Sequence, residues 1–175
     1  MEIFLEKLHI ADAEQLFEFE LYNRTYFEEM VPTRGADYYN FDFFKSRHES
    51  LLEEQAQGIC CFYLIKDKEG SILGRINLID IEEPQGIAHL GYRVGKIHTG
   101  KGIANRALKL LVEKVVEEGA IKQIEAKTTN NNIASQKVLE RNGFEQIGMS
   151  DETFEMNNQQ LKFVHYSWLL VEKLK

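Results

Sequence analysis

The stretch that decides the fold runs from His89 to Leu108 and reads His-Leu-Gly-Tyr-Arg-Val-Gly-Lys-Ile-His-Thr-Gly-Lys-Gly-Ile-Ala-Asn-Arg-Ala-Leu. This pattern predicts a strand over 87–94, a glycine-spaced loop over 95–100 and a helix that continues to about residue 118. The first amides of a helix have no acceptor within the helix and lie at the positive end of its dipole, so they attract anions. Because Gly100 and Gly102 keep side chains away from that backbone, the stretch predicts an anion site.

Two common phosphate motifs do not fit this loop. The Gly-x-x-x-x-Gly-Lys-Ser/Thr pattern of a P-loop does not occur. The dinucleotide fingerprint Gly-x-Gly-x-x-Gly/Ala fails at its sixth position, where Asn105 stands. From the residues alone, the two glycines are equally compatible with a tight turn that joins a strand to a helix.

The rest of the chain alternates strand and helix patterns around this stretch. Further strands are expected over 2–8, 59–65, 72–81, 121–128, 144–148 and 161–170, with a turn at Asn157-Asn158 before the last strand. Helices are expected from Asp12, capped with Gln15 at the capping-box offset, and over about 42–57 and 133–141. The apolar stripe of the helix after Gly102 is expected to be Ala104, Ala107, Leu108, Leu111 and Val115. This order predicts a single α+β domain over residues 1–175, with a mixed sheet and one parallel crossover (87–94, helix, 121–128).

Composition excludes several classes of function. The chain has 175 residues, 43% of them hydrophobic, and a net charge of −7, so no basic surface for nucleic acid is expected. No apolar run reaches the ~20 residues of a membrane span. The acidic balance serves solubility or weakly attracts a cationic acceptor. Cys60 and Cys61 are adjacent, which argues against a disulfide framework and favours a cytoplasmic location, and the five histidines lack metal-ligand spacing.

Two blocks of sequence resemble a known family. Thr99-Gly100-Lys101-Gly102-Ile103-Ala104 resembles the Gln/Arg-x-x-Gly-x-Gly/Ala pyrophosphate loop of the GNAT N-acetyltransferases, with Thr99 where Gln or Arg is usual. Asn132 to Phe144 is similar to the Asn-x-x-Ser-x-x-Val-Leu-Glu-Lys-x-Gly-Phe block of the ribosomal-protein N-acetyltransferase branch. The resemblance covers about residues 70–170.

The resemblance implies a fold and a co-substrate. The fold is a three-layer α/β/α arrangement with a central mixed, mostly antiparallel sheet that splays between its fourth and fifth strands. Acetyl-CoA would lie in the split, with its pantetheine arm along the backbone of Tyr92, Arg93 and Val94. The cofactor-binding loop would be Thr99, Gly100, Lys101, Gly102, Ile103 and Ala104. Asn132 would bond the pantetheine, although its place before Ile133 also suits a helix N-cap.

Acetyl transfer to an amine requires a base for the ammonium and an acid for the leaving thiolate. Ser135 is the leading candidate acid, by its place in the second block, and it is equally suited to cap the helix. The tyrosine that many family members carry four residues later is Leu139 here. His89 is the leading candidate base because an unperturbed histidine titrates near pH 6.5. Glu125 and Glu152 are the alternative bases.

The acceptor itself is not specified by any motif. The resemblance implies direct attack of a primary amine on the thioester, with a protein N-terminal α-amine, ribosomal proteins included, or a small molecule as acceptor. A homodimer is expected for this branch. Two other functions stay open: a CoA-binding sensor or scaffold without acetyl transfer, and a doubly wound nucleotide-binding domain. The antiparallel hairpins expected over 59–81 and 144–170 argue against the second of these.

Overall fold

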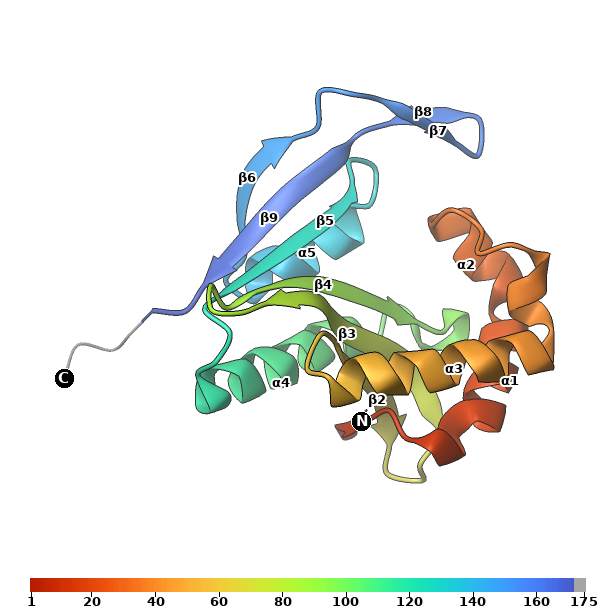
Figure 1. Ribbon diagram of the computed structural model, residues 1–175. Helices are drawn as coiled ribbons and strands as arrows, with labels where there is room; N and C mark the ends of the chain where they lie inside the picture. Colours follow the sequence, from red (N-terminus) through yellow and green to blue (C-terminus); the bar gives the residue numbers. More distant parts are fainter. Residues whose placement is uncertain (172–175) are drawn as a thin grey trace.

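The computed structural model describes residues 1–171 and contains one large mixed sheet (Figure 1). Its strand order is β1-β2-β3-β4-β5-β9-β6. Only β4 and β5 are parallel, and the other neighbours are antiparallel. The bounds are β1 (Ile3–Lys7), β2 (Cys61–Asp67), β3 (Ile72–Glu82), β4 (Ile87–Val94), β5 (Gln123–Thr129), β9 (Phe163–Leu169) and β6 (Glu145–Met149).

Helices cover both faces of this sheet, which confirms the expected three-layer α+β arrangement (Figure 1). On one face, α4 (Ile103–Glu118) and α5 (Ile133–Arg141) enclose the larger apolar core, which includes Ile76, Leu108 and Tyr166. On the other face, a second core that includes Leu16, Phe44 and Leu64 lies under the N-terminal helices. Those helices are α1 (Ala13–Tyr22), α2 (Arg24–Met30) and α3 (Phe41–Ala56), with the 3-10 turns η1 (Ile10–Asp12) and η2 (Ala36–Tyr39).

The parallel pair β4–β5 opens along its length. Pairing is confined to Ile87–Gln123, Ala88–Ile124 and His89–Glu125. Beyond that point β5 stays paired with β9 as far as Thr129–Phe163, and β4 stays paired with β3 as far as Val94–Gly74. The sheet therefore divides into two halves at the carboxyl ends of β4 and β5, as Figure 1 shows, and the expected splay is confirmed.

Helix α4 carries the expected amphipathic stripe with one change. Ala107, Leu108, Leu111 and Val115 are buried, but Ile103 takes the buried position that the sequence pattern gave to Ala104. Ala104 faces the opening between the sheet halves instead. The buried stripe of α4 therefore begins at Ile103, one residue earlier than the sequence pattern predicts.

The start of α1 is not capped as expected. The predicted box of Asp12 and Gln15 is wrong: Asp12 makes no side-chain cap to α1. Instead His9 caps η1, and Asp12 Oδ2 accepts from the His9 amide at 2.8 Å. Gln15 donates its amide to the Gly70 carbonyl at 3.2 Å, a contact 55 residues away that sequence spacing does not reveal.

Several short elements were missed because tertiary contacts create them. Asn23 ends α1 and so separates α2 from it, since Asn23 Oδ1 accepts from the Lys96 amide at 2.9 Å. The expected strand 161–170 is divided: Lys162 bonds Asn130, and β8 (Gln159–Leu161) pairs with β7 (Phe154–Met156). The predicted turn at Asn157-Asn158 joins β7 to β8 with φ of 51° and 63°.

Candidate functional site

Three adjoining cavities occupy the space where the sheet opens. The loop cleft, about 580 Å³, lies between the loop before α4 and the start of α5. The inner cavity, about 230 Å³, lies between the diverging strands β4 and β5 under the β7–β8 hairpin. The helix-side cavity, about 660 Å³, lies between the sheet and α3. Val31 and Tyr92 line all three, so the cavities meet at β4.

The loop cleft ends at the amino terminus of α4. The 3-10 turn η3 (Lys96–His98) leads into this loop, and Gly100 and Gly102 both have φ of 74°. Gly102 is the N-cap residue and supplies no side-chain acceptor, so the first amides of α4 are left for an external acceptor. A Cβ at either glycine would meet nothing within 4 Å, which shows that the backbone borders open space. This geometry fits a pyrophosphate group.

The side chains of the loop support its shape. Thr99 Oγ1 donates to the Lys96 carbonyl at 2.8 Å, so its hydroxyl is engaged and the anion contacts fall to backbone amides. Arg106 donates to the Lys101 carbonyl at 2.8 Å, to the Gly102 carbonyl at 3.3 Å, and also to the Met1 carbonyl. Sequence reasoning missed Arg106, whose only sequence signal is its place one turn into α4. It fixes the loop through carbonyls and leaves the amides free.

Most of the predicted co-substrate residues border this cleft. Tyr92, Arg93, Val94, Thr99, Gly100, Gly102, Ile103, Ala104, Asn132 and Ser135 line it, and Lys101 does not. The rim carries Lys137 and Arg141 from α5, two cations that the sequence reasoning did not assign. The cleft thus has an open helix terminus at one end and positive charge along one side.

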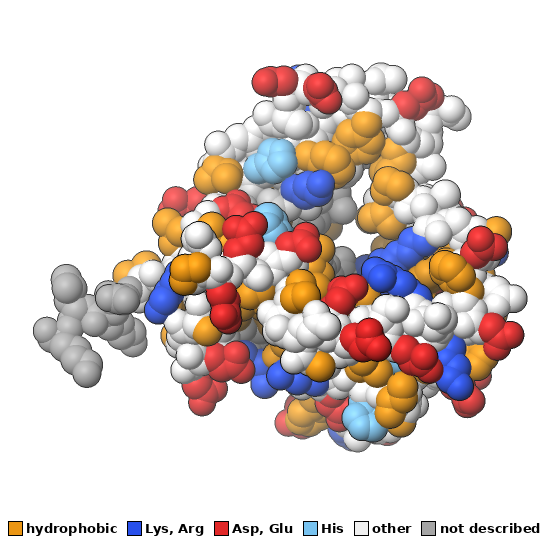
Figure 2. Space-filling model, viewed as in Figure 1, with side chains coloured by type: hydrophobic (Ala, Val, Ile, Leu, Met, Phe, Trp, Pro, Cys, Tyr) orange, Lys and Arg blue, Asp and Glu red, His pale blue; other side chains and the backbone are white. Residues whose placement is uncertain are grey.

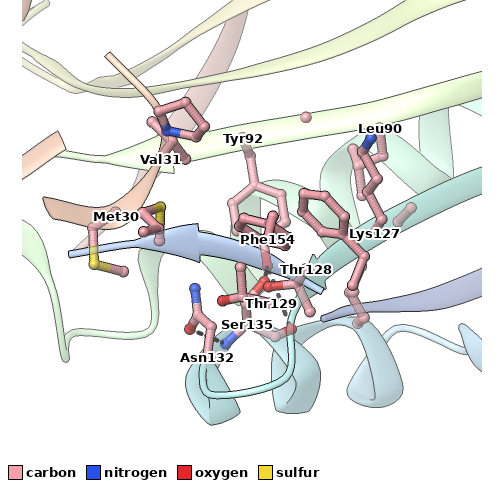
Figure 3. A pocket seen from close by; sticks show the side chains of 16 residues that line it. Met30, Val31, Leu90, Tyr92, Lys127, Thr128, Thr129, Asn132, Ser135 and Phe154 are labelled. Carbon is pink, nitrogen blue, oxygen red and sulfur yellow. Dashed lines mark hydrogen bonds between the residues drawn. The ribbon is translucent and has the colours of Figure 1, made fainter. Parts of the chain in front are cut away.

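A pair of hydroxyls lies between the loop cleft and the inner cavity. Figure 3 shows Tyr92 directed from β4 toward Ser135 on α5, and their oxygens are 2.8 Å apart. Asn132 Oδ1 accepts from the Ser135 amide at 3.1 Å, so Asn132 is the N-cap of α5. Burial raises the pKa of Tyr92, and the hydrogen bond to Ser135 offsets that rise only in part. The tyrosine is therefore protonated at neutral pH and can act as a proton donor.

The candidate bases lie outside these cavities. His89 and Glu125 are register partners at the last paired position before the splay. By strand alternation they lie on the face opposite to Ala88 and Ile124, which belong to the core under α4. Glu125 accepts from Ser167 Oγ at 3.2 Å and also from the Gln123 amide. Glu152 is exposed in the loop after β6, and it does not line any of the three cavities.

A buried ion cluster borders the helix-side cavity. Glu20 of α1 is fully buried, and its Oε1 accepts from Arg75 Nη1 at 2.8 Å and from Arg93 Nη2 at 2.7 Å. Burial opposes ionisation of Glu20, but Arg75 and Arg93 outweigh it and hold the pKa of Glu20 below its ordinary value. The sequence gives no signal for this cluster, since its members are 55 and 73 residues apart.

Among residues 1–171 there is no cluster of three or more His, Cys, Asp or Glu side chains arranged to hold a metal ion. In the same part of the chain, the helices are too short or too polar for any of them to cross a bilayer.

Comparison with known proteins agrees with this geometry. A model of the acetyltransferase (GNAT) domain matches residues 2–145. The Probable N-acetyltransferase YjcK of Bacillus subtilis is 28% identical over 159 residues, which are 89% of this chain and 87% of that protein. The [Ribosomal protein uS5]-alanine N-acetyltransferase of Escherichia coli is 25% identical over 154 residues, 87% of this chain and 79% of that protein. The crystal structure of a ribosomal-protein-S5-alanine acetyltransferase from Vibrio fischeri has a TM-score of 0.88 at 22% identity and covers 97% of this chain and 93% of that one. With a sheet that opens between β4 and β5, a glycine-capped helix at the opening and a family model that matches most of its length, the chain belongs to the GNAT acetyltransferase family.

Proposed function

We propose that this protein transfers the acetyl group of acetyl-CoA to a primary amine, within one catalytic domain over residues 1–175. The observation that carries the proposal is the opening of the β4–β5 pair beside a helix N-terminus that no side chain caps. The two features together form one continuous cleft, with hydrogen-bonding backbone along one wall and an anion site at its end. A plain strand-to-helix turn does not require that cleft.

The parts of acetyl-CoA have matching partners along the cleft. The pyrophosphate accepts hydrogen bonds from amides at Gly102, Ile103 and Ala104, where the helix dipole adds attraction. The amide-containing pantetheine arm extends along the backbone of Tyr92, Arg93 and Val94, on the edge of β4 that β5 leaves open. Lys101 lies between Gly100 and Gly102 in the loop, and its positive charge attracts the pyrophosphate without lining the cleft.

The reaction is a direct displacement at the thioester. The nitrogen of a neutral amine attacks the carbonyl carbon, the new C–N bond forms, and the C–S bond breaks with its electron pair on sulfur. The Tyr92–Ser135 hydroxyl pair is positioned to give a proton to that thiolate, and Tyr92 is the group that burial keeps protonated. Proton donation of this kind contributes about 10²–10⁴ in rate.

The proton of the amine goes to one of three candidate bases. His89 is the first candidate and Glu125, its partner across the parallel pair, is the second, each acting through water because neither lines a cavity. Glu152 is the third, and its exposed loop position makes it the weakest of the three. Asn132 supports the site by capping the helix that carries Ser135.

Relatives supply candidates for the acceptor. Two Escherichia coli relatives are a ribosomal-protein-serine acetyltransferase and the ribosomal protein uS5-alanine N-acetyltransferase. A protein N-terminal α-amine is therefore one acceptor that this proposal includes, and a small amine is the other. Free Cys60 and Cys61 accord with a cytoplasmic location. The expected homodimer stays a prediction, which sedimentation tests directly.

The deciding experiment measures two quantities on the purified chain. Thermal unfolding with acetyl-CoA, NADH and ATP tests the cleft, since ligand at about 100 times its Kd adds roughly 2.7 kcal/mol. Release of CoA thiol in the presence of amines tests the transfer. Stabilisation by acetyl-CoA without amine-dependent thiol release would favour the alternative function, a CoA-binding sensor or scaffold. The absence of stabilisation by acetyl-CoA would refute the proposal.

A further inference from the structure

The helix-side cavity has an unusual charge for this acidic chain. Four arginines line it, Arg34, Arg47, Arg75 and Arg93, and no Asp or Glu occurs among the described residues of its wall. The whole chain carries a net charge of −7. Figure 2 shows the hollow between the β5–β9 half of the sheet and the N-terminal helices, with basic side chains on its helical side. The local charge is thus opposite to the charge of the molecule.

Acidic groups behind the wall neutralise only part of this charge: Arg47 pairs with Glu54 at 3.7 Å, and Glu20 is shared by two arginines. Glu20 lies behind the wall, where one carboxylate faces the two guanidinium groups of Arg75 and Arg93. Burial lowers the pKa of Arg93, and repulsion from Arg34 and Arg75 adds to that effect, against the attraction of Glu20. Arg34 donates to Tyr38 Oη at 3.0 Å and lies over that ring, but it forms no ion pair with any described residue.

A hydrogen-bond acceptor lies beside these cations. Asn77 is two residues from Arg75 on the same face of β3, hence about 7 Å along the strand. Its Oδ1 is buried and has no partner among the described residues. Asn77 is the register partner of Gly91, where a Cβ would meet nothing within 4 Å. Gly91 also lines the inner cavity, so this acceptor lies where the two cavities join.

We propose that the acceptor carries an oxyanion, either a carboxylate or a phosphate, a few ångströms from the amine that is acetylated. The amine would lie above Gly91 and beside Asn77, next to the opening of the sheet, and the oxyanion would lie against Arg34, within the positive field of Arg75 and Arg93. Guanidinium groups match both oxyanions through paired hydrogen bonds. This inference rests on the proposed acetyl transfer, and it names the class of acceptor.

The same charge assists the chemistry. A positive surrounding disfavours the ammonium and so lowers the pKa of the bound amine, which increases the fraction of the neutral nucleophile. An amine without an anionic group loses affinity to this repulsion, and a polyamine loses most. The weak attraction of cationic acceptors that net charge alone suggests is therefore reversed inside the cavity.

The test uses matched pairs of amines at equal concentrations of the unprotonated form. The pairs are L-serine with L-serinamide, O-phosphoethanolamine with ethanolamine, and amidated N-terminal peptides with Asp or Asn at the second position. Spermidine serves as the cationic comparison. The anionic member is expected to have at least a tenfold higher kcat/KM in one or more pairs, and the pair concerned identifies a free carboxylate, a phosphate or a protein N-terminus as the source.

A substitution links the preference to the cavity. Arg34→Gln removes a cation at the exposed edge without unpairing Glu20, and KM for the preferred acceptor is expected to rise about tenfold or more. KM for acetyl-CoA and KM for the neutral partner are expected to change less than twofold. Arg24→Gln is the control, because Arg24 pairs with Glu28 and does not line the cavity.

Binding separates this inference from the proposed function. Calorimetric titration of the CoA-bound protein with the same pairs measures affinity without turnover. A binding preference for the anionic members without thiol release would support an oxyanion site in the helix-side cavity and refute acetyl transfer to these amines. Turnover with equal or better use of the neutral members and spermidine, or no difference in affinity within any pair, would overturn this inference and leave acetyl transfer intact.

Discussion

Replacing Glu20 by Gln tests how the buried ion cluster supports the face of the helix-side cavity. The carboxylate is fully buried and pairs with Arg75 at 2.8 Å and Arg93 at 2.7 Å. Glutamine keeps the shape of the side chain and removes its charge. Two guanidinium groups, one of them 6% exposed in its side chain, then face each other without a counter-charge.

The expected loss of folding stability in Glu20→Gln follows from that geometry. Removing one partner of a buried ion pair costs about 3–5 kcal/mol, since the remaining charge stays desolvated. For a domain of this size, each kcal/mol lowers Tm by about 2–4 °C, so a fall of about 6–20 °C is expected. Glu18→Gln, on the exposed side of the same helix, is the matched control and is expected to change stability by less than about 0.5 kcal/mol.

The pH dependence of stability shows whether the ionised carboxylate of Glu20 stabilises the fold. The pKa of Glu20 is lower in the folded chain than the ordinary value of 4.5 for a free glutamate, because Arg75 and Arg93 stabilise its carboxylate. Its stabilisation is therefore complete above pH 4.5 and is lost as pH falls through the folded pKa, where the carboxylate takes up a proton. The difference in free energy of unfolding between the wild type and Glu20→Gln is expected to be constant from pH 6 to 8 and to shrink below pH 4.5.

Urea unfolding of both chains across this pH range measures that difference. A Glu20→Gln protein as stable as the wild type at pH 7 would contradict the reasoning, because it would mean that the guanidinium groups reach water in the folded state. A difference that stays constant at acid pH would show that the loss comes from packing and not from charge.

Three further substitutions test the rest of the site. Gly102→Ala places a side chain on a backbone with φ of 74°, so it is expected to lower the free energy of unfolding by about 1–2 kcal/mol and to weaken acetyl-CoA binding. Gly148→Ala is the control, because Gly148 also borders open space but has no positive φ. Unfolding and ligand titration should show no measurable change in this control. Gly91→Val fills the junction of the inner and helix-side cavities, so acceptor KM is expected to rise at least tenfold with Tm within about 2 °C of wild type; an unchanged KM would place the acceptor elsewhere. Tyr92→Phe is expected to lower kcat by about 10–100-fold with KM for acetyl-CoA unchanged. Ser135→Ala is expected to lower kcat by a smaller factor, since the tyrosine retains its proton. Equal rates for the wild type and the double variant would show that neither residue takes part in proton transfer.

The open glycine loop before α4 could be predicted from sequence because its determinants are local. The N-terminus of a helix, two glycines and a preceding strand occupy adjacent positions, and backbone geometry alone makes their amides available to an anion. The alternation of strand and helix patterns likewise predicted the α+β class. Errors occurred where a distant group intervenes, as at Asp12, whose expected cap is replaced by the contacts of His9 and Gln15.

The sequence by itself predicted most of the strands and helices, the glycines at both ends of α4, and the strand–loop–helix pattern on which the proposed anion site rests. Only the tertiary structure decided which side chains meet: Tyr92 with Ser135 across 43 residues, and Glu20 with Arg93 across 73. The physical reason is the sequence range of the interactions concerned. Periodicity and capping depend on neighbours within a few residues. Strand order, register and the splay of β4 from β5 depend on packing of the whole sheet, and those features determine the charge and shape of the helix-side cavity.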